Sequence, residues 1–352
     1  MTAISDIVTT WETDEETADR VIHVEEVPAR DATATELEPP PPAELQERLA
    51  AIGIDRLYRH QVAGINAVRR GEHTVMVAGT ASGKSLVYQL PIAEAVADRP
   101  DTTALALYPT KALTQDQLRG FSRIGTDDLV AATYDGDTDT DTRRWVRAKA
   151  NVVLTNPDML HVGILPHHAR WEHFFSRLRF VVVDELHVFR GIFGSHVSLV
   201  LRRLRRIAAH YGSHPTFVFT SATIGNPGEM ATALSGMKVS VVDHDTSPQG
   251  AKTYVLWNPE LEDPRRGIRV SPMGEASRIF SQLVTEDIPT IVFSRSRKAS
   301  ELMYRWARDR LDPSRAERIS PYRAGYRASE RRRSESALFS GELLGVTATN
   351  AL

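Results

Sequence analysis

The chain has 352 residues, of which 41% are hydrophobic and 25% charged, a composition typical of globular proteins and a length typical of about two domains. No window approaches the ~20 apolar residues of a membrane helix, and the first residues show no secretory signal. The chain also contains no cysteine, which excludes a disulfide scaffold, a thiolate zinc site and a cysteine nucleophile. We therefore expect a cytoplasmic protein with no membrane and no zinc in this chain.

The net charge of -2 conceals an asymmetry between the two parts of the chain. Residues 1–42 contain 11 acidic and two basic side chains, whereas the remaining 310 residues contain 41 Lys and Arg against 34 acids. A mildly basic body is compatible with binding to a polyanion, although a solvated surface is the simpler interpretation of the charge alone.

The first 42 residues end in the run Pro39–Pro42 and are predicted to form an acidic, mostly extended arm with one short strand at 20–27. Over residues 43–245, helix-like segments alternate with apolar runs of four to six residues. This alternation predicts an α/β fold with a doubly wound parallel sheet. The expected strands cover 73–77, 104–108, 130–133, 152–155, 180–183 and 216–219, and the expected helices cover 43–52, 58–70 and 86–97.

The regular alternation weakens over residues 246–271, which we interpret as a linker around a strand at 253–257. A second alternation occupies residues 272–352, with too few strands for another sheet of the first size. We therefore expect a second, incomplete domain. Its expected helices cover 277–285, 298–310 and 329–339, and its expected strands cover 290–293 and 344–347.

A phosphate-binding loop (P loop) is predicted at residues 78–85, between an expected strand and an expected helix. Consecutive backbone N–H groups in such a loop, together with the positive end of the following helix, bind phosphate. Gly83 allows close approach of the backbone, Lys84 reaches the β and γ phosphates, and the hydroxyl of Ser85 ligates Mg²⁺. The predicted ATP-binding residues of the loop are Ala78, Gly79, Thr80, Ala81, Ser82, Gly83, Lys84 and Ser85.

Two adjacent carboxylates, Asp184 and Glu185, directly follow the expected strand at 180–183. They are expected at the carboxyl edge of the sheet, where ligands of α/β proteins bind. Asp184 can hold Mg²⁺, and Glu185 can orient and deprotonate an attacking water. An isolated acidic pair at a strand end is usually only solvated, but the P loop upstream favours a catalytic role for Lys84, Asp184 and Glu185.

Six short motifs surround these two features in a fixed order. Each motif alone is an ordinary turn at a strand end, whereas the whole series around a P loop and an acidic pair is not. The motifs are Leu57–Gln61, Tyr108–Leu113, Thr155–Asp158, Thr220–Thr223, Phe293–Ser296 and Ala348–Ala351.

Together with the box Asp184-Glu185-Leu186-His187, these motifs resemble the superfamily 2 DEAD/DEAH-box helicases, and among them the MrfA/YprA-type DNA helicases. The resemblance covers about residues 45–352. It implies that 43–245 is a RecA-like P-loop NTPase domain and that 272–352 begins a second, incomplete RecA-like domain. It also implies ATP and Mg²⁺ as cofactors, single-stranded or tailed duplex DNA as partner, and a role in DNA repair.

The resemblance also assigns roles to individual residues. Gln61 contacts the adenine edge beside Arg59, and His187, Ser221 and Thr223 couple the ATP site to the nucleic-acid track. The residues that the resemblance places on that track are Pro109, Thr110, Lys111, Thr155, Asn156, Asp158, Ser294, Arg295, Thr349 and Asn350.

The sequence departs from this family at its C-terminus. Family members continue into a helix whose arginines complete the ATP site, and then into a cysteine-rich zinc-binding region; neither is present here. We therefore expect a truncated product that binds ATP and hydrolyses it slowly. The alternatives are a catalytically weak ATP- and DNA-binding remnant, an RNA helicase of the same superfamily, and a P-loop NTPase that is not a helicase.

Overall fold

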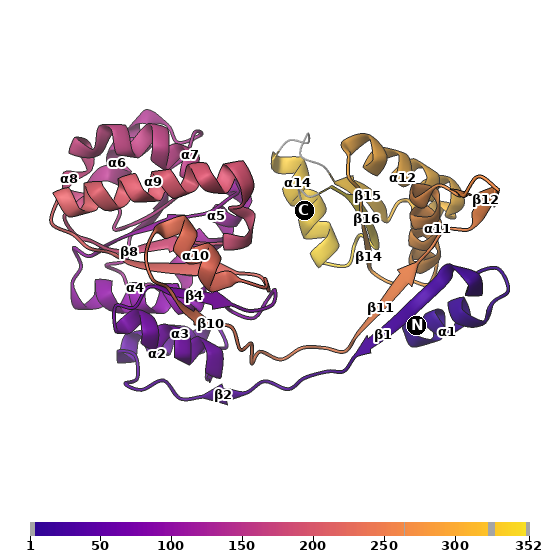
Figure 1. The fold of residues 1–352 in the computed structure, drawn as a ribbon, viewed down its shortest axis with the longest axis horizontal. Helices are drawn as coiled ribbons and strands as arrows, with labels where there is room; N and C mark the ends of the chain where they lie inside the picture. The colour runs from indigo at the N-terminus through magenta and orange to yellow at the C-terminus, as the bar shows by residue number, and fades with distance from the viewer. Residues whose placement is uncertain (1–3, 264, 323–327, 350–352) are drawn as a thin grey trace. The chain divides into compact units, whose positions relative to one another are not determined.

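The computed structural model describes residues 4–263, 265–322 and 328–349 (Figure 1). The chain forms two compact units: a large unit, Ala29–Gly250, and a small unit, Met1–Pro28 with Ala251–Leu352. The chain therefore passes from one unit to the other at residues 28/29 and again at 250/251. The domain boundaries predicted from the sequence were at residues 42, 245 and 271.

The large unit is built on a seven-stranded sheet whose neighbouring strands are all parallel, in the order β10-β4-β9-β8-β5-β7-β6. The predicted doubly wound parallel sheet is thus confirmed. The strands are β4 (Thr74–Val77), β5 (Thr103–Leu107), β6 (Ala131–Thr133), β7 (Val152–Thr155), β8 (Leu178–Val183), β9 (Thr216–Ser221) and β10 (Ser240–Val242).

Helices cover both faces of this sheet, because alternate residues of each buried strand point to opposite sides. Val75 and Val77 of β4 belong to the hydrophobic core on one face, whereas Met76 belongs to the core on the other face. The first face packs against α6 (Thr140–Lys149), α7 (Pro157–Met159), α8 (Glu172–Phe175), α9 (Gly191–His210) and α10 (Pro227–Ser235). The second face packs against α3 (Arg59–Arg69), α4 (Leu86–Asp98) and α5 (Lys111–Ile124).

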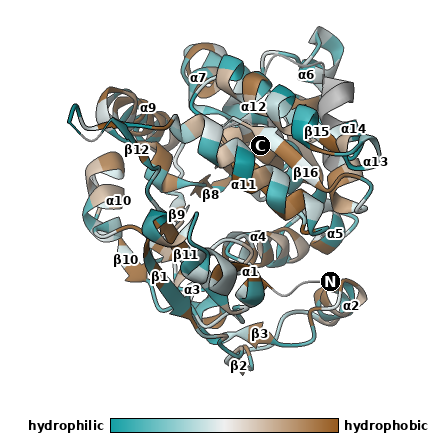
Figure 2. Ribbon diagram, turned by 90° about the vertical axis from the view of Figure 1, so that its right-hand side faces the viewer, coloured by the Kyte–Doolittle hydropathy of each residue, from teal (hydrophilic) through white to brown (hydrophobic). Residues whose placement is uncertain are grey.

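Shorter elements complete the large unit. Figure 2 shows that its helices combine hydrophobic and hydrophilic residues, as expected for helices with one buried side. The remaining elements of the large unit are β2 (Ala34–Thr35), α2 (Ala43–Ala51), β3 (Leu57–Tyr58), η2 (Leu160–Ile164), η3 (Leu165–Trp171) and η4 (Leu186–Val188).

The small unit contains a second, smaller parallel sheet in the order β14-β16-β15. The strand expected in the linker at 253–257 is β11, which pairs with β1 outside this sheet, and β15 is a strand that was not expected from the sequence. The elements of this part are β11 (Lys252–Trp257), β12 (Leu261–Asp263), β13 (Ile268–Arg269), α11 (Pro272–Thr285), β14 (Thr290–Phe293), α12 (Arg297–Arg310), α13 (Pro313–Ala316), β15 (Ile319–Tyr322), α14 (Ala328–Phe339) and β16 (Gly345–Ala348).

The N-terminal segment folds onto the small unit and differs from the mostly extended arm that the proline run predicted. It contains α1 (Ile4–Thr13), η1 (Ala18–Arg20) and β1 (Val21–Val27), and β1 pairs antiparallel with β11. Trp11 of α1 is buried, packs edge-to-face on Trp257 with ring centroids 5.5 Å apart, and donates from Nε1 to Oε1 of Gln282 at 3.1 Å. Burial of one apolar side of α1 stabilises the helix in a segment that is otherwise polar.

No helix in the described part of the chain is long and apolar enough to cross a bilayer.

Candidate nucleotide site and nucleic-acid interface

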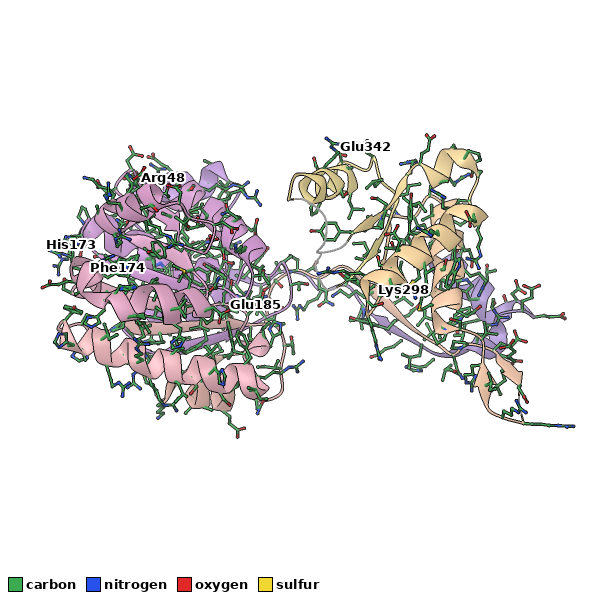
Figure 3. All side chains as sticks on the ribbon, turned by 90° about the horizontal axis from the view of Figure 1, so that it is seen from above. Arg48, His173, Phe174, Glu185, Lys298 and Glu342 are labelled. Carbon is green, nitrogen blue, oxygen red and sulfur yellow. The ribbon has the colours of Figure 1, made fainter. Side chains whose placement is uncertain are left out.

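The register of the large sheet brings the predicted ATP-site residues to one edge. Val77 pairs with Ser221, and Val183 pairs with Phe219, so β4, β9 and β8 end side by side. Because these strands are parallel, the P loop that follows β4 and the acidic pair that follows β8 meet at the same carboxyl edge. Figure 3 shows Glu185 at one end of the large unit, opposite the end at which His173 and Phe174 of α8 lie.

The P loop forms a tight turn in which two residues have left-handed backbone conformations. Ala81 has φ 58° and Gly83 has φ 73°. Glycine suits position 83 for two reasons: it adopts the left-handed conformation without strain, and a Cβ atom there would displace Nε2 of Gln61. The ammonium group of Lys84 donates to the carbonyl oxygens of Ala78 at 3.1 Å and Gly79 at 2.5 Å, which holds the cation against the loop.

The amide of Gln61 is fixed beside this loop. Its Oε1 accepts from the backbone N–H of Tyr58 at 2.8 Å, and its Nε2 donates to the carbonyl of Gly83 at 3.1 Å. A carboxamide has two donors and two acceptor positions, so one of each remains for the edge of a base. Arg59, the first residue of α3, is exposed next to it.

Asp184 is a buried carboxylate held by three donors. It accepts from the hydroxyl of Thr220 on β9, from the backbone N–H of Glu185 at 3.0 Å, and from the hydroxyl of Tyr88 on α4 at 3.5 Å. Burial raises the pKa of Asp184 and outweighs the lowering effect of the hydrogen bonds from Thr220 and Glu185. A cation bound beside Asp184 would therefore stabilise the ionised form of its carboxyl group.

Glu185 adopts a left-handed backbone conformation with φ 56°, which costs a non-glycine residue about 1–2 kcal/mol. This turn directs the chain into η4. Burial and the neighbouring charge of Asp184 raise the pKa of the Glu185 carboxyl, whereas His187 and Lys84 lower it. A carboxylate with a raised pKa is a better proton acceptor than an ordinary surface glutamate.

The third strand end at this edge belongs to β9. The backbone N–H of Ala222 lies 3.4 Å from Nδ1 of His187, so the box and the loop after β9 touch, and Thr223 is exposed in that loop. The hydroxyl of Ser221 is fully buried and has no hydrogen-bond partner among the residues that the structure describes. A buried unpaired hydroxyl at a strand end is available for a water or a ligand oxygen.

These residues fit a magnesium ion. Mg²⁺ prefers oxygen ligands, usually retains several waters, and is held by one or two protein groups plus substrate phosphates. Ser85 lies directly before α4, and the carboxylate of Asp184 follows β8, one strand beyond β9 at the same carboxyl edge. Within the described residues no group of three or more His, Asp or Glu could hold a metal ion by itself.

The candidate nucleic-acid residues of the large unit lie at strand ends and helix starts. Thr110 is the exposed N-cap of α5, and Lys111 follows it with half of its side chain exposed, paired with Asp137. Asn156 caps α7 by accepting from the backbone N–H of Met159 at 2.8 Å. Pro109 is partly buried and Asp158 is exposed at the same edge.

Thr155 does not face solvent as expected for a phosphate-contacting hydroxyl. The residue is only 1% exposed, and its Oγ1 donates to the carbonyl of Tyr134 at 2.6 Å. Its hydroxyl therefore joins β7 to the chain after β6, and we leave Thr155 out of the track proposed below.

The small unit brings a second group of these residues together. Phe293 pairs with Ala348 in the parallel β14–β16 ladder, so Ser294 and Thr349 follow neighbouring strand ends. The backbone N–H of Ser294 donates to the carbonyl of Ala348 at 2.8 Å, and Arg295 is exposed beside it. Asn350, the last residue predicted for the track, lies outside the described residues.

Two residues of the large unit contact the P loop without having been predicted as site residues. Asp245 accepts from the backbone N–H of Gly79 at 2.9 Å, and Nε2 of His60 lies 3.1 Å from the carbonyl of Ser82. His60 occurs inside the motif Leu57–Gln61, but Asp245 lies 166 residues from Gly79 and no local pattern marks it.

A P loop and an acidic pair at the carboxyl ends of two strands of one doubly wound parallel sheet are typical of a P-loop NTPase. Residues 58–230 match the family model of the DEAD/DEAH box helicases, so this region of the chain is similar to that family.

Individual relatives extend the similarity beyond that region. The uncharacterized ATP-dependent helicase YprA of Bacillus subtilis is 41% identical over 342 residues, which are 95% of this chain and 45% of YprA. The DUF1998 helicase MrfA bound to DNA has a TM-score of 0.92 at 38% identity over 99% of this chain and 47% of MrfA. MrfA bound to DNA and AMPPNP has a TM-score of 0.91 at 38% identity over 99% of this chain and 49% of MrfA. The similarity to MrfA/YprA-type helicases is confirmed, and the chain spans about half the length of these relatives.

Proposed function

We propose that this chain binds ATP and Mg²⁺ at the carboxyl edge of the large sheet and hydrolyses ATP to move along DNA, as an ATP-dependent helicase or translocase. The observation that carries this proposal is the meeting of the P loop, which follows β4, with Asp184 and Glu185, which follow β8, at the same carboxyl edge of the sheet. The crystal structure of MrfA with DNA and AMPPNP supports it, because an ATP analogue and DNA bind that relative together.

Each residue at this edge has a defined part in the proposed chemistry. A bound Mg²⁺ would neutralise the charge that develops on the phosphates. Lys84 turns its ammonium from the loop carbonyls to the β and γ phosphates, and the backbone N–H groups of the loop hold the same oxygens. Glu185 orients a water and accepts its proton, for which its raised pKa is favourable. Gln61 binds the edge of the adenine.

Most residues of the proposed DNA track carry hydroxyl, amide or cationic groups, and they lie exposed or partly exposed at strand ends and helix starts. Such positions suit phosphate contacts, which fix a strand without reading its sequence. Asp158 is an exception, because its carboxylate repels phosphate and can only accept from a base or sugar. The track residues are Pro109, Thr110, Lys111, Asn156 and Asp158 in the large unit, and Ser294, Arg295 and Thr349 in the small unit.

The test is ATP hydrolysis by the whole chain with and without single-stranded DNA, together with DNA binding at several salt concentrations. We expect hydrolysis that rises when DNA is added, and an affinity that is indifferent to sequence and falls steeply with salt. The slope of the logarithm of the DNA-binding constant against the logarithm of the salt concentration should fall by about one in Lys111→Ala. It should be unchanged in Lys149→Ala, because Lys149 is an exposed residue of α6 outside the proposed track.

Three outcomes would change the proposal. Salt-independent affinity for DNA would contradict the phosphate track. Stimulation by single-stranded RNA but not DNA would favour an RNA helicase, since only RNA offers the 2′-hydroxyl. Binding of ATP and DNA without measurable hydrolysis would favour the binding-only alternative. A role in DNA repair and a cytoplasmic location stay predictions made from the sequence.

A further inference from the structure

The chain enters and leaves the large unit through two segments that are hydrogen-bonded to each other. The backbone N–H groups of Arg30 and Gln249 each donate to the carbonyl of the other residue at 2.8 Å. We call residues 29–33 and 245–250 the connecting ribbon. Both passages between the units therefore begin next to these hydrogen-bonded residues.

The carboxylate of Asp245 joins this ribbon to the P loop. Its Oδ2 accepts from the backbone N–H of Gly79 at 2.9 Å, and its Oδ1 accepts from the backbone N–H of Ser247 at 2.9 Å and from the Ser247 hydroxyl at 2.7 Å. The guanidinium of Arg30 lies 3.5 Å from the same Oδ1. Burial raises the pKa of Asp245, but the hydrogen bonds from Ser247 and Gly79 together lower it by more. The pKa is therefore below its ordinary value, and the carboxylate is an anion at neutral pH.

His60 forms a second link between the same two parts. The backbone N–H of Thr246 donates to Nδ1 of His60 at 3.1 Å, which leaves the ring proton on Nε2. Nε2 lies 3.1 Å from the carbonyl of Ser82 and therefore donates to the P loop. The side chain is fully buried, and burial lowers the pKa of His60, so the ring is neutral and this tautomer is kept.

We propose that Asp245 and His60 are positioning residues that fasten the P loop to the connecting ribbon, so that nucleotide binding in the loop tightens both passages between the units. The inference rests on the proposed nucleotide function. The two links reach the loop at its beginning, Gly79, and near its middle, Ser82. Ordering of the loop by phosphate therefore also orders the residues bonded to it, and by reciprocity a loosened ribbon weakens nucleotide binding.

The test is hydrogen–deuterium exchange of the whole chain with and without AMPPNP and Mg²⁺, read in peptides that cover residues 29–33 and 245–250. In the parent chain, nucleotide should slow exchange in both segments by at least about threefold. In Asp245→Asn, which keeps the size but loses the charge, this slowing should disappear at 29–33, and nucleotide affinity should fall by about tenfold. Asp243→Asn is the matched control, because Asp243 is exposed two residues upstream.

A second variant guards against a folding defect in the first. Ser247→Ala removes one donor to Asp245 without touching the P loop, so it should reduce the slowing at 29–33 in the same direction and by less. Equal slowing in the parent chain, Asp245→Asn and Ser247→Ala would overturn the inference while leaving the proposed nucleotide site intact. Failure of the parent chain to bind AMPPNP would instead overturn the proposed function itself.

Discussion

Nδ1 of His187 lies 3.2 Å from Oε2 of Glu185 and 3.4 Å from the backbone N–H of Ala222. A protonated Nδ1 donates to the carboxylate, whereas an unprotonated Nδ1 accepts from Ala222. Nδ1 of His187 can therefore form a hydrogen bond either with Glu185 or with Ala222 in the loop after β9. The tautomer of the ring decides which of the two bonds forms.

Removing this imidazole should separate ATP binding from its response to DNA. We expect His187→Ala to bind nucleotide with an affinity within about twofold of the parent chain, and to lose about tenfold in DNA-stimulated hydrolysis, the size of one hydrogen bond to a charged group. Steady-state hydrolysis at saturating DNA measures the effect. His196→Ala, an exposed histidine on α9, is the control. Full stimulation in His187→Ala would show that the ring does not couple the two parts.

Replacing Glu185 by Gln should abolish hydrolysis and preserve binding. The amide has the same size but cannot accept the proton of water, so hydrolysis should fall by at least about 100-fold. Single-turnover hydrolysis and binding of a fluorescent ATP analogue measure the two effects separately. Glu172→Gln is a matched control, since Glu172 is exposed on α8 at the other end of the sheet. Equal turnover in Glu185→Gln and the parent chain would remove Glu185 from the mechanism.

The buried charge of Asp184 should lower the stability of the large unit. A carboxyl with a raised pKa binds its proton more tightly in the folded state. Its ionised form therefore costs free energy of folding at pH values above the folded pKa, and this cost disappears as pH falls below the unfolded pKa. Asp184→Asn should raise the thermal midpoint at pH 8, by about 2–4 °C for each kcal/mol gained, and the gain should shrink toward pH 4.

Thermal unfolding of the parent chain and Asp184→Asn at pH 8, 6 and 4 measures this difference. Asp158→Asn removes an exposed carboxyl at the same edge and should leave the midpoint unchanged. A lower midpoint for Asp184→Asn at pH 8 would mean that hydrogen bonds from Thr220 and Tyr88 outweigh the cost of burial.

The N-terminal helix should stabilise the small unit only. Trp11→Ala removes the edge-to-face contact with Trp257 and the hydrogen bond to Gln282, so we expect a loss of about 3 kcal/mol in that unit. Limited proteolysis should cut first beyond residue 251, with nucleotide binding preserved, because the P loop belongs to the large unit. Trp145→Ala, at a 49% exposed tryptophan on α6, is the control. Unchanged proteolysis in Trp11→Ala would contradict the docking.

Strands with uninterrupted β-branched and apolar residues were predictable from the sequence. The bounds expected for 152–155 and 290–293 agree with β7 and β14, because each is a short apolar run between turn residues. The strand β15 was missed, since Pro321 inside it argues against a strand, and proline is tolerated there only because β15 lies at the edge of its sheet.

The candidate site was predictable to the extent that its residues follow strand ends in a recognisable order. The P loop, Asp184 and Glu185 are such residues. Asp245 is different, because its partner Gly79 is 166 positions away and only the folded chain brings a carboxylate to that N–H group. The pairing of β1 with β11 is equally non-local, so the proline run suggested a mostly extended arm where the chain folds back on itself.

The central claim is that residues 78–85 bind the phosphates of ATP, and Lys84 tests it most directly. Equilibrium binding of a fluorescent ATP analogue with Mg²⁺ should be compared in the parent chain, Lys84→Ala and Lys149→Ala. We predict that Lys84→Ala binds at least about tenfold more weakly, because it loses the charge on the β and γ phosphates, and that Lys149→Ala binds like the parent chain. Equal binding by the parent chain and Lys84→Ala would contradict the account.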